Sequence, residues 1–172
     1  YKVSGGLHGV GASVVNALSE WLEVEIANEG KIYKQRYERG KVCYKLRVDR
    51  ECEPVMRGTK VTFLPDKEIF EETVFDYNTL KQRFREMAFL TKGLKISLKD
   101  TREGMEREKV FHYEGGIREF VSYLNRSKEA LYPEIIYCEG QQNGVSVEVA
   151  MQHNDSYTEN CYGSVSYTHL RA

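Results

Sequence analysis

A glycine-rich segment near the start of the chain is the feature best suited to do chemistry. It consists of GGLHGVG over residues 5–11 and runs directly into an apolar stretch of helical period. Glycines leave backbone N–H groups open to a nearby anion, and the first N–H groups of a helix are unpaired and partly positive. The spacing of Gly6, Gly9 and Gly11 therefore predicts a phosphate-binding loop, although similar glycine runs also form ordinary tight turns.

Two better-known phosphate loops do not fit this segment. A P-loop carries Lys and then Ser or Thr after its last glycine, whereas Ala12 and Ser13 follow here. A dinucleotide-binding fingerprint needs the reverse glycine order in a parallel βαβ unit, whereas antiparallel strands are expected here. The nearby polar side chains leave two roles open. Lys2 either contacts a phosphate or is a surface lysine, and His8 either contacts phosphate or shapes the turn.

The other candidate residues predict structure rather than chemistry. His112 is expected to be a hydrogen-bonded residue at a strand end. The basic residues Lys81, Arg83 and Arg85 are expected to be solvated surface. The cysteines form no C-x-x-C pair and have no histidine at metal-ligand spacing, so isolated thiols in a reducing compartment and no metal site are expected. They are Cys43, Cys52, Cys138 and Cys161.

The composition indicates a folded domain rather than a disordered or membrane-spanning segment. Of the 172 residues, 41% are hydrophobic and 30% are charged, which suits a chain with a packed core. No apolar run approaches the roughly 20 residues of a membrane helix, and no signal-peptide pattern is present. The isolated thiols lead us to expect a cytoplasmic protein. The net charge of -1 neither favours nor excludes a polyanionic partner. A first residue other than Met predicts an internal fragment.

The periodicity predicts both a helix behind the glycine loop and a sheet beside it. Apolar residues at helical spacing predict helices over 12–22 and 78–92, and the second is expected to begin at Asp76 or Asn78 and to stop at Gly93. Alternating residues between turn signals predict a mostly antiparallel series of strands. These strands are expected over 22–28, 31–38, 41–48, 59–64, 94–100 and 106–113.

The pattern restarts near Gly115, where we expect a domain boundary. A short helix is predicted from Ile117 to Leu124. It is followed by a hairpin of strands over 135–139 and 145–151, joined by a turn that carries an Asn-Gly dipeptide.

The segment YKVSGGLHGVGASVVNALSEWLEV resembles the gyrase B family of type II DNA topoisomerase ATPase subunits. The similarity continues through the Gly58-Thr59 strand, FLTKGLKISLKD and FHYEGGIREFVSYLN, and fades after about Val165. The ATPase component of topoisomerase IV is similar but departs more around FHYEGGI, so the gyrase protein is the better match.

The resemblance implies an α+β fold in two parts. The first is part of a two-layer α/β sandwich of the ATPase type shared by gyrase, heat-shock ninety chaperones, mismatch-repair clamps and histidine kinases. The second is part of a ribosomal-S5-like transducer domain. The implied division is 1–114 for the C-terminal part of the ATPase domain, 115–165 for the start of the transducer and 166–172 for a non-native or unassigned tail. An ATPase sheet without its first strands is expected to expose unpaired edges and apolar surface.

The resemblance also implies an ATP site that needs Mg2+. Its residues would be Tyr1, Lys2, Gly6, Leu7, His8, Gly9, Val10, Gly11 and Thr59, with the glycine loop on the phosphates and Thr59 helping to hold the adenine. The family's general-base glutamate, magnesium-ligand asparagine and adenine-reading element lie upstream, and its γ-phosphate lysine lies downstream. This segment is therefore expected to have no catalytic or metal-binding residue and to be inactive alone. Asn28 stands where relatives often carry an arginine that contacts aminocoumarin inhibitors.

The enzyme implied by the resemblance uses ATP-driven clamp closure to pass one DNA segment through another and to introduce negative supercoils. Its partners would be the gyrase A protein in a heterotetramer, DNA, and a second copy that dimerises through the ATPase domain. Three alternatives stay open: the topoisomerase IV protein, a non-catalytic dimerisation module with a relic nucleotide site, and a mismatch-repair clamp ATPase. The intact glycine loop and helix argue against the relic, and the match across both domains argues against the mismatch-repair protein.

Overall fold

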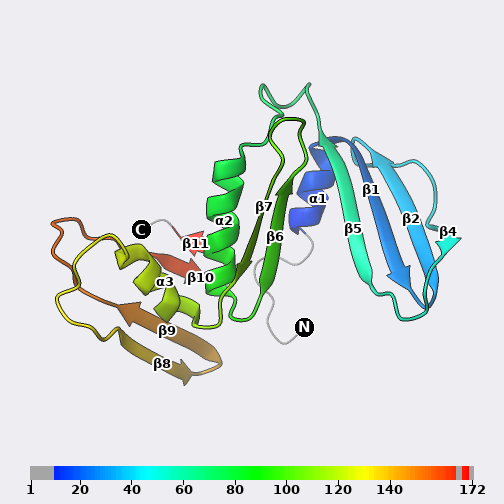
Figure 1. Ribbon diagram of the computed structural model, residues 1–172. Coiled ribbons are helices and arrows are strands. Elements are labelled where there is room, and N and C mark those ends of the chain that lie inside the picture. The colour runs from blue at the N-terminus through cyan, green and yellow to red at the C-terminus, as the bar shows by residue number, and fades with distance from the viewer. Residues whose placement is uncertain (1–9, 166–167, 171–172) are drawn as a thin grey trace. The chain divides into compact units, whose positions relative to one another are not determined.

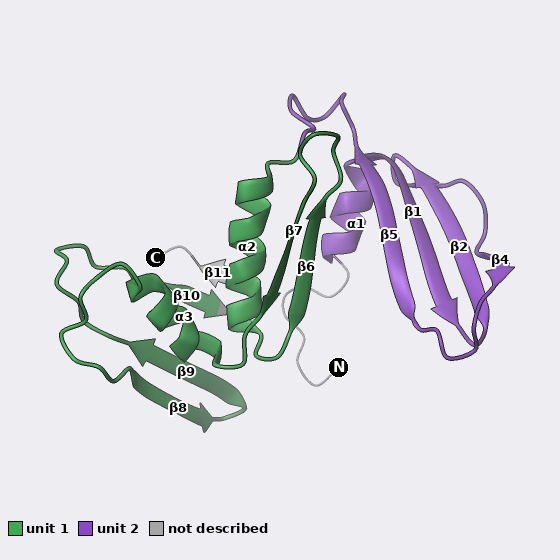
Figure 2. Cartoon of the chain, in the orientation of Figure 1, with its two compact units in different colours: residues 1–6, 75–172 green, residues 7–74 purple. Residues whose placement is uncertain are grey.

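The computed structural model describes residues 10–165 and 168–170 of an α+β chain (Figure 1). The chain divides into two compact units. One unit is formed by residues 7–74, and the other by residues 1–6 and 75–172 (Figure 2).

The unit of residues 7–74 is an antiparallel sheet preceded by a helix. Strand β1 is central and pairs with β2 from Trp21–Glu38 to Asn28–Lys31, and with β5 from Ser19–Pro65 to Ala27–Gly58. The strand order is β3-β2-β1-β5, and β4 also pairs with β2. The elements are α1 (Val10–Ala17), β1 (Ser19–Asn28), β2 (Lys31–Glu38), β3 (Lys41–Val42), β4 (Arg47–Glu51) and β5 (Gly58–Pro65).

The two faces of this sheet differ in chemistry. Residues opposite one another on antiparallel strands share a face. One face is charged: Lys34 Nζ lies 3.0 Å from Glu23, and Glu25 lies 3.2 Å from Arg50 and 3.7 Å from Lys60. The other face is mainly apolar and aromatic. It is formed by Leu22, Val24, Ile26, Tyr33, Gln35, Tyr37, Thr59, Val61 and Phe63.

The first helix is shorter than the periodicity predicts. The expected helix over 12–22 ends at Ala17, and β1 begins at Ser19. Trp21 and Leu22 have helical spacing from the residues before them, but both pair with β2 and β5, and the ladders on both sides of β1 override the local period. The predicted helix was therefore wrong over its last turn.

The strand expected over 41–48 is interrupted. β3 pairs Val42 with Tyr37, and β4 pairs Arg47 with Lys34. Val42 and Arg47 are five positions apart, whereas their partners on β2, Tyr37 and Lys34, are three positions apart. Two extra residues therefore loop out between β3 and β4. The alternation of residue types carries no signal for this irregularity.

In its described residues, the unit containing residues 75–172 has two longer helices and three two-stranded antiparallel sheets. Each predicted element from 78 to 151 is present, with ends shifted by a few residues. The elements are α2 (Tyr77–Leu90), β6 (Lys95–Asp100), β7 (Arg107–His112), α3 (Gly116–Asn125), β8 (Ile136–Gln142), β9 (Val145–Met151), β10 (Gly163–Val165) and β11 (Thr168–Leu170).

Helix α2 begins at a predicted cap but ends two residues before the predicted end, with Thr91 as its C-cap. Asp76 is its N-cap, and its carboxylate accepts a hydrogen bond of 2.7 Å from the backbone N–H of Thr79. That bond lowers the pKa of Asp76. Gly93 follows the helix with φ of 78°, the left-handed conformation that favours glycine.

Asp100 is a buried carboxylate that fixes the β6–β7 turn. Its side chain is 7% exposed and accepts bonds of 2.8 and 2.6 Å from the Arg102 guanidinium, and one of 3.3 Å from Arg107. Arg102 also donates to the carbonyl of Phe75, at the start of this unit. The bonds from Arg102 hold the pKa of Asp100 far below its usual range.

The stabilisation from Asp100 is expected to depend on pH. A carboxyl whose pKa is lower in the folded than in the unfolded state stabilises the fold above the unfolded value of about 3.9, and this contribution disappears as the pH falls. Asp100→Asn should therefore lower the melting temperature at pH 7 and by a smaller amount at pH 3, where the unfolded carboxyl is mostly protonated while the folded one is still ionised. The rest of the effect should be lost only as the pH falls further, through the folded pKa of Asp100. Glu103→Gln, in the same turn, serves as the control and should change little at either pH. An Asp100→Asn deficit of equal size at both pH values would contradict the argument.

Candidate nucleotide-binding site

Only part of the predicted site lies on described residues. Tyr1, Lys2, Gly6, Leu7, His8 and Gly9 lie outside the described residues. Val10 and Gly11 are the first two residues of α1, and Thr59 is the second residue of β5.

The N-terminus of α1 has the properties of an anion site. The helix begins at Val10, inside the glycine-rich segment, so Val10 and Gly11 are helical rather than part of a loop, and its first turn has no acidic residue. Its first backbone N–H groups have no partners within the helix, and its dipole places positive potential there. Negative charge is therefore favoured at this end of α1, and nothing in its first turn opposes it.

No described residue packs against Gly11 at this end of the helix. A Cβ atom built at Gly11 meets no described heavy atom within 4 Å, and the residue has no positive φ that would require glycine. Neither backbone conformation nor packing against described residues explains a glycine in this helix. Close approach of a ligand to the backbone is one role that such a glycine can serve.

Thr59 lies on the mainly apolar face of the sheet. It pairs with Ile26, and Val61 and Phe63 follow it on the same face, with 52% and 39% of their surfaces exposed. A hydroxyl beside exposed apolar side chains suits the flat ring of a base. The exposure also confirms the expected apolar surface, and β5 is an edge strand of this sheet as described.

The structure corrects the prediction that Arg85 is solvated surface, and it confirms the prediction that His112 is a strand-end residue. Arg85 is not simply solvated: its guanidinium donates to the Tyr123 hydroxyl at 2.5 Å and lies 5.0 Å from the centre of that ring. Arg83 pairs with Glu86 at 3.2 Å. His112 ends β7, with Nδ1 3.4 Å from the carbonyl of Leu94, as expected of a strand-end residue.

No metal site or membrane helix is found among the described residues. In 10–165 and 168–170, no three His, Cys, Asp or Glu side chains gather closely enough to hold a metal ion. Within the same part of the chain, every helix is too short or too polar to cross a membrane. All four cysteines are free thiols.

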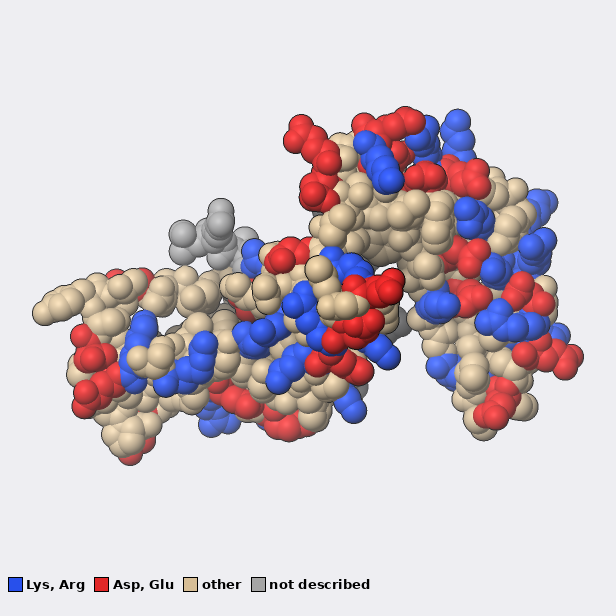
Figure 3. Space-filling model, turned by 45° about the horizontal axis from the view of Figure 1, so that its top comes forward, with Lys and Arg blue, Asp and Glu red and all other residues tan. Residues whose placement is uncertain are grey.

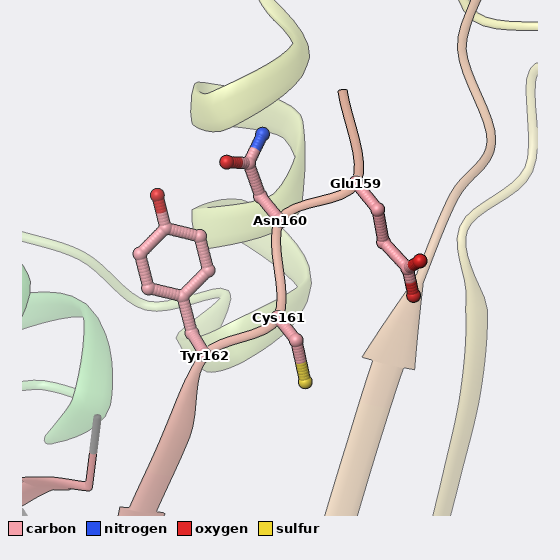
Figure 4. Close-up of a pocket in the computed structure, with 4 residues that line it drawn as sticks. All are labelled: Glu159, Asn160, Cys161 and Tyr162. Carbon is pink, nitrogen blue, oxygen red and sulfur yellow. The ribbon is translucent and has the colours of Figure 1, made fainter. Parts of the chain in front are cut away.

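A surface hollow in the other unit is a poor candidate for a binding site. It is lined by Glu159, Asn160, Cys161 and Tyr162 (Figure 4). Their side chains point alternately to the two sides of the segment and do not converge on one point. The hollow contains a carboxylate and no basic group, so it does not suit a nucleotide.

The chain is similar to gyrase B proteins over nearly its whole length. Residues 116–168 match a family model described as DNA gyrase B, which extends the similarity past Val165. The DNA gyrase B protein of Clostridium acetobutylicum is 54% identical over 98% of this chain. The DNA topoisomerase 4 B protein of Streptococcus pneumoniae is 52% identical over 96% of it. The chain spans 26% and 25% of these two relatives.

Solved structures give the same result. The 43K ATPase domain of Thermus thermophilus gyrase B, in complex with an aminocoumarin, matches 90% of this chain at 40% identity with a TM-score of 0.78, and 42% of that structure is covered. The gyrase B protein of Myxococcus xanthus matches 88% of the chain at 27% identity, also with a TM-score of 0.78. The predicted resemblance to the gyrase B family and the α+β fold are confirmed.

Proposed function

We propose that this chain is part of an ATP-driven type II DNA topoisomerase, because it resembles gyrase B proteins over nearly its whole length. The proposed enzyme closes a dimeric clamp on DNA when ATP binds, passes one DNA segment through another, and introduces negative supercoils. Its proposed partners are the gyrase A protein, DNA and a second copy of the same chain, and its proposed location is the cytoplasm.

One observation carries the proposal: the glycine-rich run continues into α1, and no described atom lies within 4 Å of a Cβ built at Gly11. In the proposed complex, the phosphates of ATP are bound by backbone N–H groups of residues 6–11. Lys2 adds positive charge, Tyr1 lies near the nucleotide, and Thr59 helps to hold the adenine.

The residues of this segment bind the nucleotide but do not complete its hydrolysis. Phosphoryl transfer depends on positioning the attacking water and on neutralising charge at the phosphates. The resemblance assigns the general base and the magnesium ligand to residues upstream, and a lysine for the γ-phosphate to residues downstream. We therefore expect no ATP turnover above background from the 172-residue chain alone.

We propose that residues 115–165 begin the transducer domain, which relays the nucleotide state to the parts that hold DNA. The family match that begins at residue 116 supports this boundary. Lys and Arg are interspersed with Asp and Glu on the face shown in Figure 3, which fits a segment whose DNA is gripped mainly by other domains.

The choice between gyrase and topoisomerase IV rests on a narrow margin. Identities of 54% and 52% do not separate the two proteins, and the gyrase assignment rests on the FHYEGGI stretch and the gyrase B family match. The intact start of α1 favours a working nucleotide site over a relic.

A supercoiling assay on the full-length protein, with the gyrase A protein and relaxed circular DNA, tests the proposal. ATP-dependent negative supercoiling is the expected result. With catenated DNA as a second substrate, decatenation without supercoiling of the relaxed circles would favour topoisomerase IV. The absence of both activities and of ATP hydrolysis would favour the non-catalytic module. The same assay without ATP is the control.

Asn28 is expected to weaken aminocoumarin binding. It is exposed at the end of β1, where a longer side chain has room, and it stands where relatives often carry an inhibitor-contacting arginine. The Thermus relative is known in complex with such an inhibitor. Asn28→Arg should therefore bind an aminocoumarin more tightly by calorimetry, whereas Lys31→Arg, on the paired strand, adds no cation and should not. Equal affinity in Asn28→Arg and wild type would count against this role.

A further inference from the structure

A buried carboxylate lies beside the far end of α1, at the first residue after β5. The Asp66 side chain is 3% exposed. Its two oxygens face the guanidinium of Arg39, with Nε at 2.8 Å and Nη2 at 3.5 Å. Arg39 also reaches Glu68 at 2.6 Å, but the Glu68 side chain is 72% exposed. Asp66 is therefore the buried member of this cluster, and removing the partner of a buried charge is costly.

Asp66 also forms a hydrogen bond with the residue that follows the C-terminal end of α1. Its backbone N–H donates to the carbonyl of Leu18 at 3.1 Å, and the N–H of Leu18 donates to Val14 at 3.0 Å. Ser19, 1% exposed, donates from its hydroxyl to Val15 at 2.6 Å. Since α1 has no buried residue of its own, these bonds at its C-terminal end are its main described anchor.

Arg39 holds a turn against the same helix end. Arg39 and Gly40 join β2 to β3 with φ of 48° and 76°, and a positive φ is unfavourable for a residue with a side chain. The N–H of Arg39 donates to Glu20 at 3.2 Å, and a Cβ built on Gly40 would lie 3.7 Å from the Cα of Ala17. The ion pair thus keeps a strained turn packed on the last residue of α1.

We infer that the Arg39–Asp66 pair is a positioning device for the nucleotide helix. It fixes the C-terminal end of α1, so the helix N-terminus keeps its place relative to the sheet when phosphate binds. This inference rests on the proposed function, because it assigns the ligand at the start of α1 to be ATP. Neither residue contacts the nucleotide, and both act through α1.

Two measurements on the full-length protein test this role. The first is the affinity for a non-hydrolysable ATP analogue, and the second is amide hydrogen exchange in α1 compared with β2. Asp66→Asn is expected to lower the affinity for the analogue about tenfold, because a misplacement of about 1 Å caused by a distant mutation can cost up to about 100-fold. It should also speed exchange at Leu18 and leave β2 unchanged. Arg39→Lys, which keeps the charge but loses the two-pronged contact, should have a smaller effect in the same direction.

Arg50→Gln is the matched control. Arg50 also forms ion pairs on this sheet, with Glu25 at 3.2 Å and Asp49 at 2.6 Å, but it lies on β4. It should leave analogue affinity and α1 exchange unchanged. If the wild type binds the analogue and both Asp66→Asn and Arg39→Lys bind it equally well, the inference is refuted and the proposed function is not. A wild type that does not bind would refute the proposed function and the inference with it. If Asp66→Asn does not fold, Arg39→Lys decides, because its side chain is half exposed.

Discussion

Replacing Gly11 by alanine is expected to stabilise the chain and, in the full-length protein, to weaken ATP binding. Gly11 lies in α1 without a positive φ, and an added Cβ meets no described atom within 4 Å. Alanine should therefore stabilise the helix by about 0.5 kcal/mol through the lower entropy of the unfolded chain. The same methyl group occupies the space through which phosphate would reach the backbone. We expect ATP affinity to fall at least about tenfold, or about 1.4 kcal/mol.

The opposite signs of these two effects make the test specific. A substitution that merely damages the fold lowers stability and binding together. Gly140→Ala is the matched control, because Gly140 lies in β8, has no positive φ, and also has no described atom within 4 Å of an added Cβ. It should leave ATP affinity unchanged. Calorimetry with a non-hydrolysable ATP analogue and thermal melting give the two readouts. Unchanged affinity in Gly11→Ala would remove the main support for a phosphate site at α1.

Local signals in the sequence were sufficient for most of the helices and strands. Gly93 marks the end of α2, Asp76 marks its start, and the Asn143-Gly144 turn joins β8 to β9. In each case a residue type has a conformational or hydrogen-bonding preference that acts within a few positions. These preferences predict where elements begin and end without knowledge of the tertiary fold.

Long-range contacts could not be predicted in the same way. The pair of Arg39 and Asp66 joins residues 27 positions apart, and neither lies in a recognisable motif. Arg102 reaches the carbonyl of Phe75 across an equal separation. The end of α1 was also missed, because pairing on both sides of β1 decides it. Sheet register and ion pairs of this kind depend on the whole topology and leave no local pattern.

The residues of the candidate site also fall into those with a local sequence signal and those without one. The glycine spacing alone pointed to phosphate, and α1 begins within it, at Val10. Thr59 has no such signal: a Gly-Thr step before a strand is usually only a turn. Its place on the mainly apolar face follows from its pairing with Ile26, which the sequence does not reveal. Thr59 was therefore identified only through the family resemblance.

Replacing Phe89 by alanine is expected to have the largest effect on stability. Phe89 is 1% exposed, and its ring lies 3.7 Å from that of Tyr113 and 5.2 Å from that of Phe120. It thereby joins α2 to α3 and to the residue after β7. Loss of a buried phenyl ring removes its transfer energy and leaves a cavity, which together cost about 3–5 kcal/mol. Urea denaturation followed by circular dichroism measures this loss.

Met87→Ala separates the effect of burial from that of shortening a side chain in α2. Met87 lies two residues before Phe89 on the same helix, but 45% of its surface is exposed. Exposed side chains lose little on truncation, and alanine is at least as good a helix former as methionine, so a change below about 1 kcal/mol is expected. A loss of about 3–5 kcal/mol is a large share of the roughly 5–15 kcal/mol of a typical domain, so Phe89→Ala should be partly unfolded before much denaturant is added. If Phe89→Ala and Met87→Ala lose similar amounts of stability, the packing of Phe89 against Tyr113 and Phe120 is not central to this unit. Unequal losses are expected because only Phe89 is packed in an aromatic core.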